Sequence, residues 1–219
     1  MIGTVSRSCS AAPGTRAGPP GTAFTKFTAA DYKSWVARLV GPENADSALK
    51  AYPADKYSGP YAIPYVIGDF ITDSGMRGLG GCTNIAVATS LASQTPTFYY
   101  EFDDPNVPAP STPAGYEYLA SHGYDVPYLS PDSPRGEDVS SRFTSAQRQL
   151  SAEMIRYWGE FTKNHRPSGQ GQASWPQLSD TMMILRPGGS YVSPVSTFSN
   201  DHACSFWSMM PPILDRGEI

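Results

Sequence analysis

Long apolar runs are missing from this sequence of 219 residues. No window approaches the roughly 18 consecutive apolar residues that a membrane-spanning helix needs. The first residues, MIGTVSRSCSAAPGTRAGPPGT, also lack the apolar stretch of about 7–15 residues that marks a signal peptide. We therefore expect no membrane span and, without a signal peptide in the chain, a cytoplasmic location by default.

Charge is scarce as well. The chain has 16 basic and 20 acidic residues, a net charge of −4 and only 16% charged residues. No basic patch is available to neutralise phosphates, and no like-charge run is long enough to act as an interaction tail. We therefore expect no nucleic-acid partner.

Neither the cysteines nor the Gly-rich segment of the sequence matches a cofactor-binding motif. The three cysteines, Cys9, Cys82 and Cys204, do not have the spacing of a zinc or redox motif, and their odd number leaves one over in any disulfide scheme. GLGG lacks the Lys-Ser/Thr that follows in a P-loop. The acidic pairs Asp103–Asp104 and Glu137–Asp138 lie in expected loops, where adjacent carboxylates are usually solvated. We expect neither a metal nor an organic cofactor.

Apolar side chains are plentiful: 40% of residues are hydrophobic and 12% aromatic, enough for a packed core. The 20 glycines and 21 prolines predict many short elements joined by turns. Residues 1–23 have no helical or strand period and are expected to be irregular. From residue 24 to 219 no composition shift marks a second domain, so we expect one partial domain.

The sequence pattern in the first half of that domain predicts helices. Thr28 and Asp31 form an N-terminal capping pattern before an amphipathic stretch that runs to Val40. A second helix is expected over residues 45–51, ending before Pro53. From Ile63 to Leu91 the pattern predicts a helix, a break at GMRGLGG and a further helix.

The sequence pattern in the second half predicts a strand and a long helix. TFYYEF, residues 97–102, is rich in aromatic residues and is typical of a buried strand. The clearest helix follows Thr144, which forms a capping box with Gln147. Its apolar face consists of Leu150, Met154, Tyr157, Trp158 and Phe161.

Five segments in order resemble one family. They are TPTFYYEFDDPNVPAP, AGYEYLASHGYDVPYL, FTSAQRQLSAEMIRYWGEFTKN, SWPQL and HACSFW. Together they resemble the C-terminal region of type-B carboxylesterases, such as the cholinesterases and para-nitrobenzyl esterases, over roughly residues 24–207. The resemblance implies an α/β class with a partial α/β-hydrolase fold, namely the C-terminal strands of the sheet with their covering helices. It also implies a serine esterase of small carboxylic esters that needs no cofactor.

His122 occupies the place of the family's catalytic histidine, which acts as general base and then as general acid. Without the resemblance, His122 reads as a loop histidine that bonds nearby backbone. Asp125 stands where the family has glutamate, which changes the support of the histidine and not the reaction. We expect His165 and His202 to be structural.

The rest of the triad is missing. No Gly-x-Ser-x-Gly occurs in the chain, so the nucleophile is absent, and so is the oxyanion loop. Residues 1–4, MIGT, are similar to the start of the family's Gly-x-x-x-Asp-Glu-Gly turn, but the next 18 residues resemble nothing in the family and have the bias of a shifted reading frame. Asp31, Asp69 and Asp73 are the nearest carboxylates, and none is assigned as the acid. We expect a frameshifted or truncated gene product that is nearly inactive alone.

Cys82 and Cys204 fall where many cholinesterase-like proteins have a disulfide. Two buried free thiols are the alternative, and Cys9 would remain unpaired in either case.

Two other functions remain open: a non-catalytic interaction module, or one half of a split esterase completed by an N-terminal partner chain. Missing sheet strands would leave exposed strand edges, which favour pairing or self-association.

Overall fold

The computed structural model describes residues 1–5, 26–74, 80–108, 116–130 and 138–210. Its contacts divide the chain into two compact units. The sheet unit consists of Met1–Ser6 and Asn84–Phe198, and the helical unit consists of Arg7–Thr83 and Ser199–Ile219. No composition shift in the sequence marks this division. Each unit is described by itself below.

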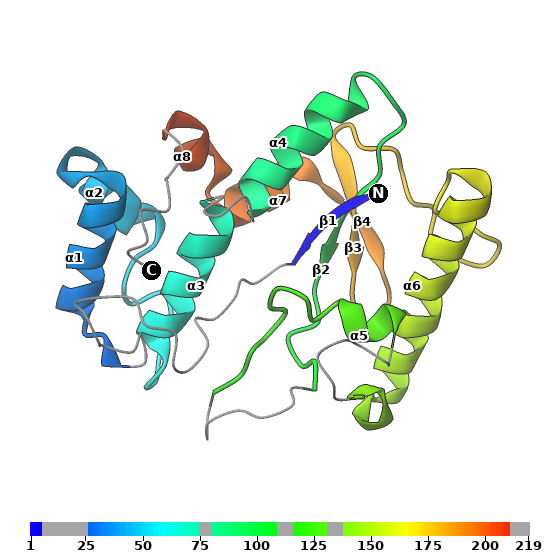
Figure 1. Cartoon of the computed structure of the whole chain (residues 1–219), viewed down its shortest axis with the longest axis horizontal. Helices are drawn as coiled ribbons and strands as arrows, with labels where there is room; N and C mark the ends of the chain where they lie inside the picture. The colour runs from blue at the N-terminus through cyan, green and yellow to red at the C-terminus, as the bar shows by residue number, and fades with distance from the viewer. Residues whose placement is uncertain (6–25, 75–79, 109–115, 131–137, 211–219) are drawn as a thin grey trace. The chain divides into compact units, whose positions relative to one another are not determined.

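The sheet unit is built on four strands in the order β1-β2-β3-β4 (Figure 1). They are β1 (Ile2–Val5), β2 (Tyr99–Phe102), β3 (Thr181–Leu185) and β4 (Tyr191–Pro194). β1 and β3 both run parallel to β2, whereas β4 runs antiparallel to β3. Side chains of β2 are buried on both faces, as expected for a parallel strand covered on two sides. The predicted strand at residues 97–102 is confirmed, two residues shorter than expected.

Strand β1 corrects one expectation. We expected residues 1–23 to be irregular, but Ile2–Val5 pair with Tyr99–Phe102 of β2. Four residues are too few to show a period, and their pairing partner is distant in the sequence, so local patterning could not reveal this strand. Residues 6–25 lie outside the described part of the chain.

Helix α6 (Ser145–Asn164) covers the sheet with the predicted apolar face. Its capping box is present: the Gln147 backbone N–H donates to Thr144 Oγ1 at 3.2 Å, and the Thr144 N–H donates to Gln147 Oε1 at 2.8 Å. Leu150, Met154 and Tyr157 are buried in the core of the unit. Shorter elements complete it: α5 (Val126–Leu129) and the 3-10 helix η3 (Ser140–Arg142). Helices α4 (Gly81–Ala92) and α7 (Val195–Asp201) each cross a boundary between the units.

The helical unit contains α1 (Ala29–Val40), α2 (Pro42–Ala51), α3 (Ala62–Asp73) and α8 (Cys204–Met209). The capping box of α1 is present as predicted from Thr28 and Asp31. Helix α2 starts earlier than predicted, because Pro42 suits the first helical position and Gly41, with φ of 84°, makes the sharp turn from α1.

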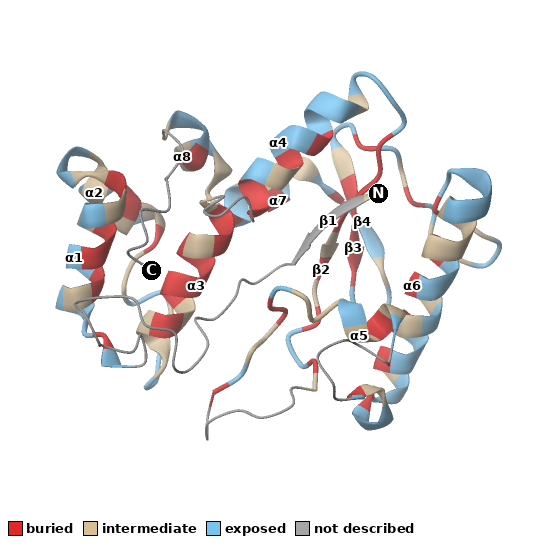
Figure 2. Cartoon of the chain, viewed as in Figure 1, coloured by how far each residue is buried: buried red, intermediate tan, exposed pale blue. Residues whose placement is uncertain are grey.

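The core of the helical unit is aromatic. The ring centroids of Trp35 and Phe70 lie 5.2 Å apart, and those of Phe70 and Trp207 lie 4.9 Å apart. Both pairs have edge-to-face geometry. Helix α3 contributes Val66, Ile67 and Phe70 to this core and is mainly buried (Figure 2). The predicted helix beginning near Ile63 is therefore confirmed, although the break at residues 75–79 lies outside the described residues. Where the structure is described, no helix combines the length and the apolar character needed to cross a bilayer.

Candidate active site

His122 lies on an exposed turn of the sheet unit, between β2 and α5. The turn is closed by a hydrogen bond from the Tyr124 N–H to the Ser121 carbonyl at 3.0 Å. Gly123 has a φ of 79°, a conformation that favours glycine and that lets the chain reverse direction after the histidine. The imidazole is therefore presented to solvent on a defined turn, where a reacting group can reach it.

Asp125 fastens this turn to the sheet. The Tyr100 hydroxyl, on β2, donates to Asp125 Oδ2 at 3.0 Å. Burial raises the pKa of Tyr100, and the charge of Asp125 raises it further, so the phenol keeps its proton and remains the donor. Asp125 thus supports the histidine turn through a strand that lies 25 residues earlier in the chain.

The three other carboxylates considered from the sequence all have partners within the helical unit. The Asp31 carboxylate accepts from the Thr28 N–H in the capping box of α1. Asp69 accepts from Lys56 and Tyr57, each at 2.6 Å. Asp73 pairs with His202. These contacts give each carboxylate a structural role, and none is assigned as the partner acid of His122.

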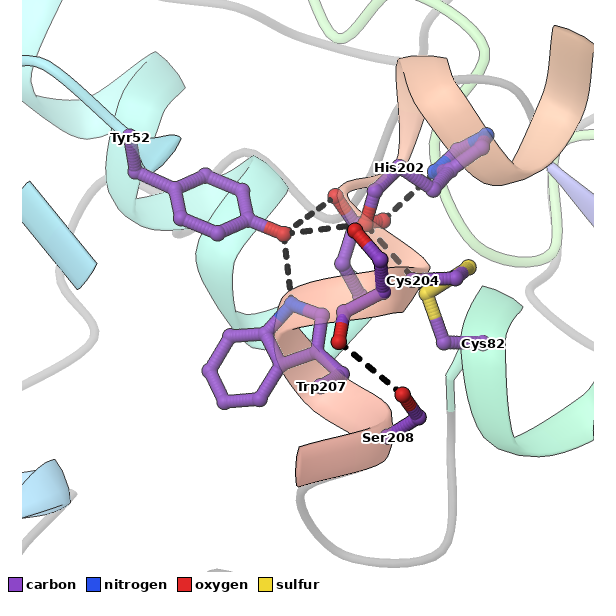
Figure 3. Close-up of a disulfide and its surroundings, with 8 residues drawn as sticks. Tyr52, Cys82, His202, Cys204, Trp207 and Ser208 are labelled. Carbon is purple, nitrogen blue, oxygen red and sulfur yellow. Dashed lines mark hydrogen bonds and ion pairs between the residues drawn. A yellow bond between two sulfur atoms is a disulfide. The ribbon is translucent and has the colours of Figure 1, made fainter. Parts of the chain in front are cut away.

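Cys82 and Cys204 are joined by a disulfide that spans 122 residues of sequence (Figure 3). It links the first turn of α4 to the first residue of α8. The disulfide pairing expected from the resemblance is therefore the arrangement that the structure has. Cys9 lies outside the described residues.

A buried polar cluster lies beside the disulfide. His202 Nδ1 is 2.6 Å from Asp73 Oδ1, and both side chains are almost fully buried. The Tyr52 hydroxyl donates to Asp73 Oδ2 at 2.9 Å and accepts from Trp207 Nε1 at 2.5 Å (Figure 3 labels Tyr52, His202 and Trp207). The cluster ties α8 to α3 and to the end of α2. His202 is therefore structural, as expected, but nothing in the sequence singled out Asp73 as its partner.

This pair should make stability depend on pH. Burial is the largest cause of a raised pKa of Asp73, while the hydrogen bond and charge of His202 act in the opposite direction. A raised pKa means that the folded chain holds a proton more tightly than the unfolded chain, so stability is lost as the pH rises. The loss begins at the pKa of the unfolded aspartate, 3.8, and continues until the pH passes the raised pKa of folded Asp73.

We therefore expect the free energy of unfolding to fall by up to about 1.4 kcal/mol per pH unit above roughly pH 4. Urea unfolding between about pH 4 and 8 measures this slope. The double variant Asp73→Asn/His202→Gln should flatten it, whereas His165→Asn, at an exposed helix end, should retain it. An equal slope in the double variant and the wild type would rule out Asp73 as its cause.

Within the described residues, no three His, Cys, Asp or Glu side chains come together as a metal site would require.

Comparisons with known proteins identify the family of this chain. The model of the carboxylesterase family matches residues 25–207. Human cocaine esterase is 26% identical over 133 residues, which cover 58% of this chain and 22% of that protein. Rat carboxylesterase 1D is 27% identical over 157 residues, covering 71% of this chain and 26% of that protein. The chain thus spans about a quarter of the length of these curated relatives.

Solved structures show the fold. EstA of Aspergillus niger superposes with a TM-score of 0.68 at 15% sequence identity, covering all of this chain and 40% of EstA. A PNB esterase gives a TM-score of 0.55 at 17% identity, covering 91% of this chain and 37% of that protein. The small sheet with its covering helices is therefore part of an α/β-hydrolase fold.

Proposed function

Because this chain belongs to the carboxylesterase family, we propose that it is the part of a serine carboxylesterase that supplies the general base, His122, for hydrolysis of a small carboxylic ester. The observation that carries the proposal is the place of His122. It lies on an exposed turn inside the segment SHGYDVPYL, and that turn is fastened to β2 through Asp125 and Tyr100.

A solvent-exposed imidazole can accept a proton from a reacting group and return it. The imidazole takes the proton of a serine hydroxyl as its oxygen attacks the ester carbonyl, and returns that proton to the leaving alcohol. Water then attacks the acyl-enzyme with the same histidine as base, which releases the acid and restores the serine. A carboxylate on the other imidazole nitrogen would fix the tautomer.

The serine, the acid and the oxyanion donors would come from polypeptide outside this sequence. No Gly-x-Ser-x-Gly is present, and the chain corresponds to about a quarter of its curated relatives. Residues 5–22, with their shifted-frame composition, support a break in the reading frame at this point. We therefore expect the chain to have almost no esterase activity by itself.

One edge of the sheet supports completion by a further segment. Among the described residues, β1 is the last strand on its side, so its outer backbone groups are available to a parallel neighbour. The completing segment would be encoded upstream in the same gene or supplied as a separate N-terminal chain. We use "completed enzyme" below for this chain together with that segment.

The test compares the chain and the completed enzyme in hydrolysis of p-nitrophenyl acetate. We expect turnover only in the completed enzyme, together with labelling of a serine by a phosphonate ester. A completed enzyme that melts cooperatively but hydrolyses no ester would instead indicate a non-catalytic interaction module.

A further inference from the structure

Asp104 is a buried carboxylate directly after strand β2, and the proposed reaction does not use it. Only 1% of its surface is exposed. Its Oδ1 accepts from the Asn106 backbone N–H at 2.9 Å. Its Oδ2 accepts from Gln147 Nε2 at 2.8 Å and from the Tyr128 hydroxyl. The carboxylate therefore receives donors from its own loop, from α6 and from α5.

Gln147 connects this carboxylate to the start of α6. Its Nε2 also donates to the Asn106 carbonyl at 3.0 Å, while its Oε1 accepts from the Thr144 N–H in the capping box. One amide side chain thus caps α6 and holds the loop after β2. The position of Asp104 relative to α6 is fixed by directional bonds, not only by packing.

Tyr128 is the anchor of α5. Its side chain is fully buried, and its ring stacks on Phe143 with centroids 4.5 Å apart. Its carbonyl accepts from Ser151 Oγ at 2.7 Å. Burial and the hydrogen bond to Asp104 both raise the pKa of Tyr128, so the phenol remains a donor to the carboxylate.

Helix α5 continues directly from the turn that carries His122. Successive hydrogen bonds run from the Tyr124 N–H to the Ser121 carbonyl, from the Val126 N–H to the Gly123 carbonyl and from the Tyr128 N–H to the Asp125 carbonyl, at 3.0, 3.4 and 3.1 Å. Such overlapping turns leave few backbone torsions free between residues 121 and 128. A shift of Tyr128 therefore moves His122 with it.

We propose that Asp104 is a positioning residue for His122, and that it acts through the Tyr128 hydroxyl. The proposal rests on the proposed function, since it matters for hydrolysis only if His122 is the general base. Packing alone does not need this carboxylate, because an apolar side chain would fill the site without the desolvation that a buried charge costs. The carboxylate adds directional hydrogen bonds. A catalytic base needs such bonds, because the groups that support it must hold it in a defined orientation.

The test uses the full chain and the imidazole signals of its three histidines in ¹H–¹³C NMR spectra, with His122 assigned by His122→Gln. Asp104→Asn replaces one carboxylate oxygen, which accepts hydrogen bonds, with an NH₂ group. That NH₂ group would face the donors that the oxygen had bonded. Tyr128→Phe keeps the ring and removes only the hydroxyl, so it remains informative if Asp104→Asn does not fold. Asp103→Asn is the matched control, because Asp103 is the neighbouring carboxylate and pairs at 3.7 Å with Arg186 on the surface.

In both test variants we expect the His122 signal to shift or split, with the signals of His165 and His202 unchanged. Backbone hydrogen exchange over residues 119–130 should become about tenfold faster, the loss expected for one buried hydrogen bond to a charged group, and that over β3 should stay within about twofold. Asp103→Asn should behave as wild type.

An unchanged His122 signal in a folded Asp104→Asn or Tyr128→Phe chain, even with a lower urea midpoint, would overturn the proposal and leave Asp104 with a stabilising role only. These measurements need no ester turnover. An inactive completed enzyme would therefore contradict the proposed function, while the His122 signal still decides the role of Asp104.

Discussion

Replacing His122 with glutamine in the completed enzyme is expected to lower kcat for p-nitrophenyl acetate by about 10⁴-fold or more. Glutamine keeps a polar side chain on the exposed turn, so folding should be preserved. It cannot accept the serine proton, however, and the nucleophile would remain a neutral alcohol. KM should change by no more than about threefold, because the imidazole acts on the transition state and adds little to ester binding.

Steady-state kinetics with equal amounts of folded protein measure this effect. His165→Asn is the control, since His165 is also exposed and takes the left-handed conformation at the end of α6, with φ of 57°, which asparagine tolerates. It should retain wild-type kcat. A His122→Gln enzyme with more than about a tenth of wild-type kcat would remove His122 from the mechanism.

Loss of the Cys82–Cys204 disulfide is expected to lower the free energy of unfolding by about 4–5 kcal/mol in the chain-entropy model, because the bond closes a segment of 122 residues. The bond holds α8 in place within the helical unit, where Trp207 packs on Phe70 and donates to the Tyr52 hydroxyl. Without it, this helix of six residues depends on the aromatic contacts and the His202–Asp73 pair.

Urea unfolding followed by tryptophan fluorescence, with and without reductant, measures this loss. Cys204→Ser should match the reduced wild type and become insensitive to reductant. Cys9→Ser is the control and should unfold as wild type does, because the third cysteine has no part in this bond. Equal midpoints for the oxidised and reduced chains would show that the bond does not contribute to stability.

Helix boundaries could be predicted well where the sequence contains a capping motif. Thr28 with Asp31 and Thr144 with Gln147 both form the expected capping boxes, because these bonds join residues three apart and need no distant partner. The same local logic placed α3 and the strand at TFYYEF. The family segments then singled out His122 as the candidate catalytic residue, which periodicity alone would not do.

Long-range pairings escaped prediction for a physical reason. Strand β1 lies in a stretch without a period, and β3 and β4 were not expected as strands at all. β1 and β3 are held by pairing with β2, which lies about 80 to 100 residues away in sequence. The partners Asp73 and His202 are 129 residues apart, and Asp104 and Gln147 are 43 apart. Such contacts depend on the packing of whole elements, so no local pattern reports them.

The central claim, that this chain is the histidine-bearing part of a serine carboxylesterase, is tested most directly by the nucleotide sequence upstream of the Met1 codon and across codons 5–23, translated in all three frames. The account predicts Gly-x-Ser-x-Gly in the upstream translation and Asp-Glu-Gly in a shifted frame after Gly3. If neither is found, and a promoter and ribosome-binding site directly precede Met1, the chain is an independent protein and hydrolysis through a serine triad is contradicted.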